Sequence, residues 1–301
     1  MSALMAEQTC RVGDVDIAYE TFGEPSNPAL LLVMGLATQM IAWHEDFCAE
    51  LAGRGFHVIR FDNRDVGRSS AMRDLPVPTL RQLALRSKKA AGYTLSDMAA
   101  DAVGLLDQLG IERAHVVGAS MGGMIAQTIG IDHPQRVLSL CSIMSNTGAR
   151  WSGQPRLATY RVLLGTPPKD RDKFIDHVVK MYRVIGSPGF DRDEDDLRDI
   201  AGRSYDRGRN PAGSGRQLAA IIASGDRTPG LRRVSVPTVI IHGTKDKLVS
   251  PSGGRATAKA IPGARLVTIE GMGHDLPRAA WPRIIGAIAE NAARAGAPAA
   301  V

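Results

Sequence analysis

Cysteine is scarce in this chain, and its spacing rules out two classes of protein. Cys10, Cys48 and Cys141 are widely separated in a sequence of 301 residues. They cannot form a disulfide framework, and no pair has the spacing of metal ligands. Cys48 and Cys141 lie inside apolar runs, where a cysteine is usually a buried thiol.

Aromatic residues and long apolar runs are also few. Aromatic residues make up 5% of the chain and form no stripe with basic residues, so the net charge of +6 does not indicate nucleic-acid binding. No apolar run approaches the roughly 18 to 20 residues that a membrane-spanning helix needs. The segment Met1–Cys10 lacks the charged and then apolar pattern of a secretory signal. We therefore expect a cytoplasmic protein.

What the chain does contain is an alternation of short apolar segments and helical segments. Residues 29–34 (ALLLVM), for example, are apolar throughout, as a strand buried on both faces must be. The alternation predicts an α/β fold with a mostly parallel central sheet flanked by helices. We expect strands at 12–21 (an edge strand), 29–34, 57–61, 114–117, 137–144, 238–242 and 265–269. We expect helices at 43–53, 94–109 (with Ser96 as N-cap), 121–131 and 281–293.

The pattern changes between residues 145 and 234. Strand-like runs become rare, arginine and aspartate recur together, and Gly-Pro pairs separate helical stretches. Helices are expected at 156–164, 170–184, 195–205 and 215–223. We interpret residues 146–233 as a helical cap, inserted between two strands of a core that comprises residues 1–145 and 234–301.

A candidate nucleophile lies at residues 118–122 (GASMG), directly after an expected buried strand and directly before a helix. A serine on such a tight turn has strained backbone angles and an exposed Oγ, and only small residues fit beside it. The helix that follows adds partial positive charge near a developing oxyanion. The five-residue pattern is weak alone, and Ser120 as a simple helix N-cap is the alternative. The strand, turn and helix around it favour Ser120 as a nucleophile.

A serine hydroxyl needs a base to take its proton, and His274 is the best placed of the seven histidines. It lies in residues 271–275 (GMGHD), a loop between the last expected strand and the final helix, so it can reach the carboxyl edge of the sheet. The other histidines fit structural roles better, because they lie at strand starts, at helix ends, within the cap or beside a strand end. They are His44, His57, His115, His133, His177 and His242.

The third member of such a site orients the imidazole and stabilises its charged form. Asp246 follows the strand 238–242 in a short turn, which brings it to the same edge of the sheet. Asp226 is the nearest rival, but its surroundings resemble the cap. The order Ser120, Asp246, His274 is the one expected for a nucleophile on a strand-to-helix turn.

An oxyanion hole requires two backbone N–H groups aimed at the reacting carbonyl. Met121, the residue after the candidate nucleophile, is expected to supply one. Leu36, in the loop after the strand 29–34, is the candidate for the other. Residues 62–69 (DNRDVGRS) also follow a strand; we interpret them as a structural turn near the site, with charges that can pair with one another.

Four segments carry a resemblance to a known family: 34–70 (MGLATQMIAWHEDFCAELAGRGFHVIRFDNRDVGRSS), 114–127 (AHVVGASMGGMIAQ), 237–251 (PTVIIHGTKDKLVSP) and 269–277 (IEGMGHDLP). They resemble α/β-hydrolases close to aclacinomycin methylesterase-type and lipase-G-type actinobacterial carboxylesterases. The resemblance covers nearly the whole core and is loose over the cap. It implies the α/β-hydrolase fold and a carboxylic-ester hydrolase with Ser120, Asp246 and His274 as triad and Leu36 and Met121 as oxyanion donors. Many members of the fold have His-Gly where this chain has Met34-Gly35.

The expected activity is therefore hydrolysis of a small-molecule ester with an apolar acyl or alcohol part, through an acyl-enzyme on Ser120. No metal or organic cofactor is implied. Alternatives on the same triad are a thioesterase or phospholipase, a cofactor-free perhydrolase, a lactonase and a hydrolase of carbon–carbon bonds. An alternative of another class is a non-catalytic ligand receptor with the same fold.

Residues 78–91 (PTLRQLALRSKKAA) are a separate feature. They can form a short helix with leucines on one side and basic residues on the other. A surface helix with a solvated basic face is the favoured interpretation. The alternative is an interfacial lid that makes transient contact with an anionic membrane surface.

Overall fold

The structure is a computed structural model, and it describes residues 6–156, 159 and 167–296. The helix expected at 156–164 falls largely outside these residues. Within the described ranges, no helix is both long and apolar enough to cross a bilayer.

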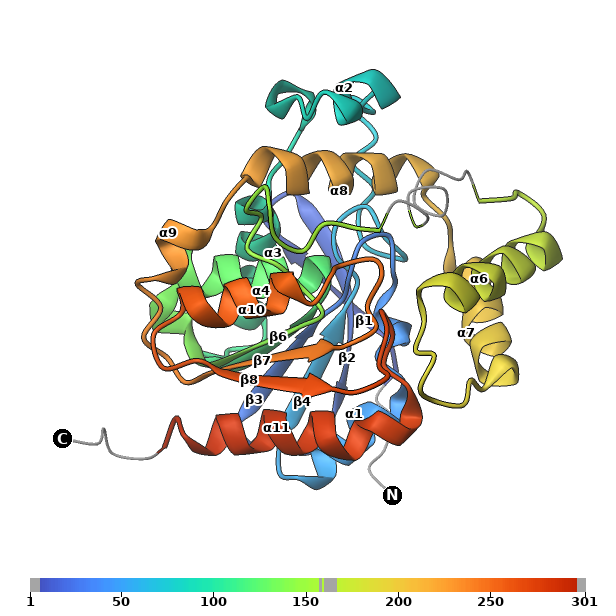
Figure 1. Cartoon of the computed structure of the whole chain (residues 1–301). Coiled ribbons are helices and arrows are strands. Elements are labelled where there is room, and N and C mark those ends of the chain that lie inside the picture. Colours follow the sequence, from blue (N-terminus) through green and yellow to red (C-terminus); the bar gives the residue numbers. More distant parts are fainter. Residues whose placement is uncertain (1–5, 157–158, 160–166, 297–301) are drawn as a thin grey trace.

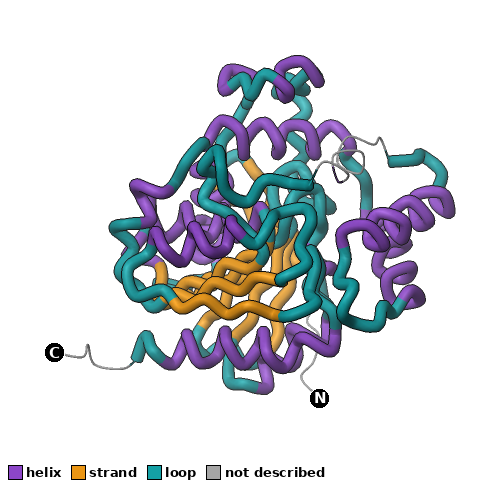
Figure 2. Tube along the Cα trace, viewed as in Figure 1, coloured by secondary structure: helices purple, strands orange, loops and turns teal. Residues whose placement is uncertain are grey.

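An eight-stranded sheet forms the centre of the described chain (Figures 1 and 2). Its strands are β1 Gln8–Val12, β2 Val15–Phe22, β3 Ala29–Val33, β4 His57–Phe61, β5 Ala114–Ala119, β6 Val137–Ile143, β7 Thr238–Gly243 and β8 Arg265–Ile269. Their order across the sheet is β1-β2-β4-β3-β5-β6-β7-β8. The pairs β1–β2 and β2–β4 are antiparallel and all others are parallel, which confirms the expected mostly parallel sheet.

The prediction of one edge strand at 12–21 is wrong. The backbone reverses at Gly13, whose φ of 54° lies in the left-handed region that glycine adopts without steric cost. The reversal separates β1 from β2 and pairs Val12 with Val15. As a result β1 is the edge strand, and β2 lies inside the sheet.

Helices cover both faces of the sheet (Figure 1). The core helices are α1 Glu45–Gly53, α3 Leu95–Gln108, α4 Met121–Asp132, α10 Ser252–Ala260 and α11 Trp281–Ala293, and the short 3-10 helices are η1 Met40–Ala42, η3 Pro134–Arg136 and η5 Arg278–Ala280. Side chains alternate along β3, so Leu31 packs in the cluster with α3 and α4 while Leu30 packs in the cluster with α1 and α11. Each face of the sheet therefore has its own hydrophobic core.

The expected N-cap of the helix at 94–109 is also wrong by two residues. The hydroxyl of Thr94 accepts a hydrogen bond from the N–H of Asp97, and the Asp97 side chain accepts one from the N–H of Thr94. This capping box satisfies two backbone donors at once, so the helix begins at Leu95. The Ser96 hydroxyl instead donates to Asp132.

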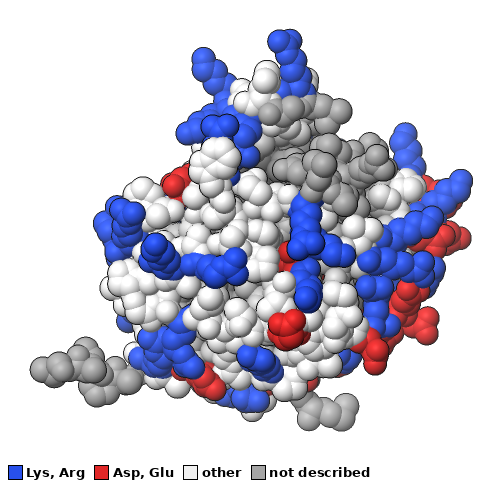
Figure 3. Space-filling model, viewed as in Figure 1, with Lys and Arg blue, Asp and Glu red and all other residues white. Residues whose placement is uncertain are grey.

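Among the described residues between β6 and β7, four further helices are present: α6 Arg171–Ile185, α7 Glu194–Arg207, α8 Pro211–Ser224 and α9 Thr228–Leu231. Figure 1 shows α6 and α7 packed together beside the sheet and α8 crossing above α3 and α4. Residues 78–91 form α2 Leu80–Ala84 and the 3-10 helix η2 Lys88–Ala90 rather than a single helix. In Figure 3, lysine and arginine gather around α2, whereas basic and acidic side chains mix over α6 and α7.

Candidate active site

Ser120 occupies the tight turn between β5 and α4 that the sequence predicts. Its φ of 56° and ψ of −117° lie outside the regions that L-residues favour. A Cβ at Gly118 would lie 2.0 Å from the carbonyl oxygen of Gly122, and a Cβ at Gly122 would lie 2.0 Å from that of Val33. Both neighbours are backbone atoms, so only glycine fits at either position.

The neighbouring strand β6 and its following loop hold this strained backbone. The N–H of Ser120 donates to the carbonyl of Ile143 at 2.9 Å. The carbonyl of Ser120 accepts from the Ser145 hydroxyl at 2.8 Å and from the N–H of Met124 at 3.2 Å. The backbone of Ser120 is thus fixed on both sides, and its Oγ is left to interact with the site.

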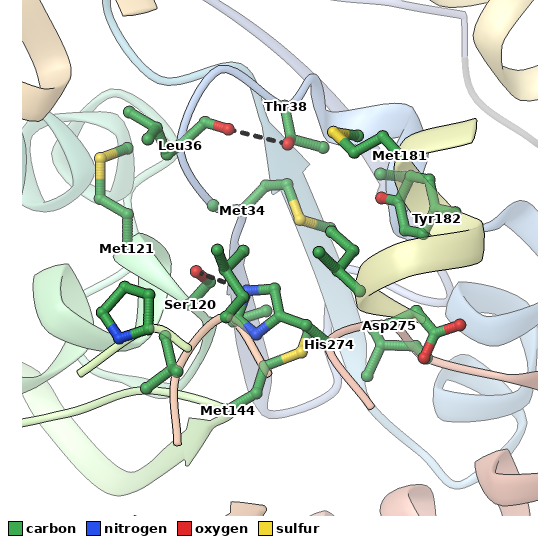
Figure 4. A pocket seen from close by; sticks show the side chains of 18 of the residues that line it. Met34, Leu36, Thr38, Ser120, Met121, Met144, Met181, Tyr182, His274 and Asp275 are labelled. Carbon is green, nitrogen blue, oxygen red and sulfur yellow. Dashed lines mark hydrogen bonds between the residues drawn. The ribbon is translucent and has the colours of Figure 1, made fainter. Parts of the chain in front are cut away.

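His274 lies in the loop after β8 and joins Ser120 to Asp246. Its Nε2 is 2.9 Å from Ser120 Oγ (Figure 4). Its Nδ1 is 2.7 Å from Asp246 Oδ2. The backbone N–H of His274 donates to the carbonyl of Ile185, at the end of α6. The structure therefore brings together the three side chains that the sequence singled out, from the ends of β5, β7 and β8.

Asp246 is held as an ionised acceptor. Its Oδ1 accepts hydrogen bonds from the N–H groups of Leu248 and Val249, both at 2.8 Å. Burial would raise the pKa of this carboxyl, but the imidazoles of His274 and His242 outweigh burial and lower its pKa well below the usual range. With both oxygens occupied, Asp246 holds Nδ1 of His274 in one orientation.

The remaining histidines have other positions. His242 packs beside the acid, with Nε2 2.9 Å from the carbonyl of Val249 and 3.5 Å from Asp246 Oδ2. His44 caps α1 by accepting from the N–H of Asp46, and burial lowers the pKa of His115 to about 4. His57 starts β4, His133 follows α4 and His177 is on α6.

The rival carboxylate, Asp226, is exposed and accepts a hydrogen bond from the Thr228 hydroxyl. It does not line the cavity that contains Ser120. The structure therefore places Asp226 away from the candidate base.

The two candidate oxyanion donors border the nucleophile. A Cβ at Gly35 would lie 3.2 Å from Cβ and 3.7 Å from Oγ of Ser120, so the peptide that joins Gly35 to Leu36 is close to the hydroxyl. Leu36 and Met121 line the same cavity as Ser120. No described residue accepts a hydrogen bond from the N–H of either, which leaves both donors for a ligand.

The cavity above Ser120 has a volume of about 440 Å³ and lies between the sheet edge and the helices α6, α7 and α8. This is the size of many small-molecule sites. Five methionines contribute to its lining: Met34, Met121, Met124, Met144 and Met181. Since methionine is unbranched and flexible, such a lining adapts to different apolar shapes. Figure 4 shows Ser120 and His274 within this methionine-rich cavity.

The turn at residues 62–69 is tied to other elements, contrary to the expected pairing among its own charges. Asp65 accepts two hydrogen bonds from the guanidinium of Arg216 on α8, at 2.8 and 2.7 Å. Asp62 accepts from Arg207 on α7, and Arg64 donates to Asp101 on α3. The sequence did not indicate these partners, because each lies at least 37 residues away along the chain, on a helix.

Within the described part of the chain, no group of three or more His, Cys, Asp or Glu side chains is arranged to hold a metal ion.

Comparisons with known proteins bear on the fold and the family of this chain. The family model of the alpha/beta hydrolase fold matches residues 28–277. A rhodomycin D methylesterase of Streptomyces peucetius is 29% identical over 296 residues, which cover 91% of this chain and 94% of that protein. A 3-oxoadipate enol-lactonase of Acinetobacter baylyi is 26% identical over 88% of each chain. The crystal structure of an enol-lactonase from Burkholderia xenovorans has a TM-score of 0.71 at 22% identity and covers 94% of this chain and 99% of that one.

The methylesterase is of the kind that the core motifs resemble, so the resemblance inferred from the sequence is confirmed. The family match extends over most of the chain, from the start of β3 to beyond His274. This protein belongs to the α/β-hydrolase family.

Proposed function

We propose that this protein is a serine hydrolase that cleaves carboxylic esters, with Ser120 as nucleophile, His274 as general base and Asp246 as orienting acid. The observation that carries the proposal is the chain of hydrogen bonds from Ser120 Oγ to Nε2 and from Nδ1 to Asp246, at 2.9 and 2.7 Å. These lengths are within the range in which a base can take a proton directly.

In the first half of the reaction, Ser120 Oγ adds to the ester carbonyl carbon while its proton moves to Nε2 of His274. The carbonyl π electrons move to the oxygen, and the N–H groups of Leu36 and Met121 stabilise the resulting negative charge. His274 then gives its proton to the leaving alcohol, and an acyl-enzyme remains on Ser120. Ionised Asp246 stabilises the imidazolium throughout.

In the second half, His274 takes a proton from water as the water adds to the acyl carbon. The second oxyanion forms at the same two N–H groups. When it collapses, the C–O bond to Ser120 breaks, the proton returns to Oγ and the carboxylic acid is released. The proton transfers between Ser120 and His274 use groups that already lie within hydrogen-bonding distance, and Asp246 lies within the same distance of His274.

The cavity supports an ester with an apolar acyl or alcohol part. We propose that residues 146–233 act as a cap, because α6, α7 and α8 contribute Met181, Leu197 and Leu218 to the cavity that contains Ser120. The relatives are a methylesterase and an enol-lactonase, and both names describe ester-type substrates. A cyclic ester is therefore the second candidate substrate class.

The test is hydrolysis of p-nitrophenyl esters from acetate to palmitate, together with a lactone series, by the wild type and by Ser120→Ala. We expect turnover by the wild type and a loss of several orders of magnitude in the variant. Ser96→Ala is the matched control, because Ser96 is an exposed serine on α3. Equal turnover by the wild type and Ser120→Ala, or none on any ester or lactone, would contradict the proposal.

A further inference from the structure

Gln217 is a fully buried side chain that links the helix α8 to two loops of the sheet edge. Its Oε1 accepts a hydrogen bond from the N–H of Ala37 at 2.8 Å, and its Nε2 donates to the carbonyl of Arg64 at 2.8 Å. Its relative exposure is 0%. One partner is a donor and the other an acceptor, so the orientation of the amide is determined by its contacts.

The first of these bonds holds a peptide next to the candidate oxyanion hole. Ala37 has a φ of 55°, an unfavourable value for a residue with a Cβ, so its backbone needs support from its surroundings. The peptide that joins Leu36 to Ala37 is held at both ends: at its N–H by Gln217, and at its carbonyl by the Thr38 hydroxyl at 3.0 Å (Figure 4).

The peptide that joins Met34 to Gly35 is held as well, because the Asn63 amide donates to the carbonyl of Met34 at 3.0 Å. The peptide between these two, from Gly35 to Leu36, carries the N–H that we assign to the oxyanion hole. Both neighbouring peptides are fixed, and the carbonyl of Gly35 accepts a hydrogen bond from the N–H of Thr38 at 3.3 Å. The direction of the Leu36 N–H is therefore set although this N–H has no partner of its own.

The helix that carries Gln217 is itself anchored. Its neighbour Arg216 makes the two hydrogen bonds to Asp65, and these two side chains are 2% and 0% exposed. The position of α8 is therefore set by the turn at 62–69, and Gln217 transmits that position to the loop that contains Leu36.

We propose that Gln217 is a positioning residue for the oxyanion hole: by holding the N–H of Ala37, it directs the N–H of Leu36 at the reacting oxygen. The inference rests on the proposed function of Ser120 and His274. It makes α8 part of the catalytic arrangement as well as a wall of the cavity.

The experiment compares two inhibitors that differ only at the reacting carbon, an aryl trifluoromethyl ketone and the corresponding trifluoromethyl alcohol. With the ketone, Ser120 Oγ adds to the carbonyl carbon, its proton moves to His274, and the π electrons become a negative charge on oxygen. The alcohol has no carbonyl and binds without this step. The ratio of the two inhibition constants therefore reports on stabilisation of the oxyanion.

For Gln217→Met, which keeps the length of the side chain but cannot accept the Ala37 N–H, we expect kcat to fall by about tenfold to a hundredfold. We expect KM and the inhibition constant of the alcohol to change little. We expect the inhibition constant of the ketone to rise by the same factor as kcat falls.

Gln127→Met is the matched control. Gln127 is also 0% exposed and donates to Ser142, but it does not contact the loop at Ala37. Gln127→Met is expected to lower Tm and to leave the ratio of the two inhibition constants unchanged.

Thr38→Val gives a second variant should Gln217→Met fail to fold, since it loosens the same peptide from its carbonyl end. It is expected to shift the ratio in the same direction by a smaller factor. A ratio equal to that of the wild type in folded Gln217→Met, or in Thr38→Val when the first variant does not fold, would overturn the inference. So would an equal loss of affinity for ketone and alcohol, which indicates a purely structural role.

Ketone binding by the wild type and by Ser120→Ala distinguishes failure of the inference on Gln217 from failure of the proposed function. If the wild type binds the ketone tightly and Ser120→Ala does not, the proposed function stands and the variants decide on Gln217. If ketone binding does not depend on Ser120, the proposed function fails and the inference fails with it.

Discussion

At the scale of single residues, the candidate site has a nucleophile, Ser120, with a strained backbone and a carboxylate, Asp246, whose two oxygens both accept hydrogen bonds. A residue with a Cβ at positive φ costs about 1 to 3 kcal/mol, and Ser120 is one of few such residues in the described chain. The hydrogen bonds of its backbone to Ile143 and Ser145 maintain that conformation. The strain is therefore a property of the turn, and its consequence is an exposed Oγ facing His274.

The role of Asp246 can be tested at this scale. We expect Asp246→Asn to lower kcat by about four orders of magnitude, because an amide that donates to Nδ1 favours the tautomer with a proton on Nε2, which cannot accept the proton of Ser120. The measurement is kcat and KM for p-nitrophenyl butyrate. Asp226→Asn is the matched control, because Asp226 is the exposed carboxylate that does not line the cavity. Unchanged kcat in Asp246→Asn would contradict the assigned role.

At the scale of elements, the turn between β5 and α4 depends on close approach of backbone segments. We expect Gly122→Ala to destabilise the protein by at least about 2 kcal/mol, because its Cβ would lie 2.0 Å from the carbonyl oxygen of Val33 and the backbone would have to move. Gly286→Ala is the control, because nothing lies within 4 Å of a Cβ at Gly286 on α11. It is expected to stabilise the protein by up to about 1 kcal/mol.

Urea denaturation measures both changes. A free energy of unfolding for Gly122→Ala equal to that of the wild type would show that β3 and α4 are not in the close contact described here.

The attachment of α8 to the turn at 62–69 is a second feature at this scale. Arg216→Met leaves the carboxylate of Asp65 buried without its charged partner, and we expect a loss of about 3 to 5 kcal/mol in the free energy of unfolding. Arg171→Met removes an exposed pair with Asp206 and is expected to have little effect. Similar losses in the two variants, measured by urea denaturation, would contradict the importance of burial at Arg216.

Much of the sheet could be predicted from the sequence. A strand buried on both faces is apolar throughout, and such a run can be identified without knowing which strands lie beside it. The strand β8 and the helix α11 have the bounds expected from their patterns alone. The strand β1 was missed, because only Gly13 marks the reversal within an otherwise continuous alternation. Gln217 could not be found in this way: its partner Ala37 lies 180 residues away, and a glutamine on a helix is usually solvated. Which polar side chains meet across two elements depends on tertiary packing, and no local pattern records it.

At the scale of the whole molecule, ion pairs link α7 to the core and make stability depend on pH. Glu45 on α1 accepts hydrogen bonds from Arg203 on α7 and from Arg60 on β4. Burial would raise the pKa of Glu45, but the bonds from Arg203 and Arg60 outweigh burial and lower its pKa from 4.5 to about 2. A carboxyl whose pKa is lowered on folding stabilises the folded state above its ordinary pKa. That stabilisation is lost as the pH falls from 4.5 toward about 2.

We therefore expect Glu45→Gln to have a lower Tm than the wild type at pH 7, with a difference that shrinks between pH 4.5 and about 2. Thermal melts followed by circular dichroism across this range provide the measurement. Glu24→Gln, at an exposed loop position, is the control, and its difference from the wild type is expected to stay constant. A Tm difference for Glu45→Gln that does not change with pH would rule out this link.

The central claim, that Ser120 is a nucleophile activated by His274 and Asp246, is tested most directly by covalent labelling. The protein is treated with a fluorophosphonate: the oxygen of an activated serine bonds to phosphorus, and fluoride leaves. The modified residue is identified by mass spectrometry of the peptides. We predict a single modified serine, Ser120, with labelling abolished in Ser120→Ala and strongly slowed in His274→Ala. No labelling of the wild type, or labelling of Ser120 at the same rate when His274 is replaced, would contradict the claim.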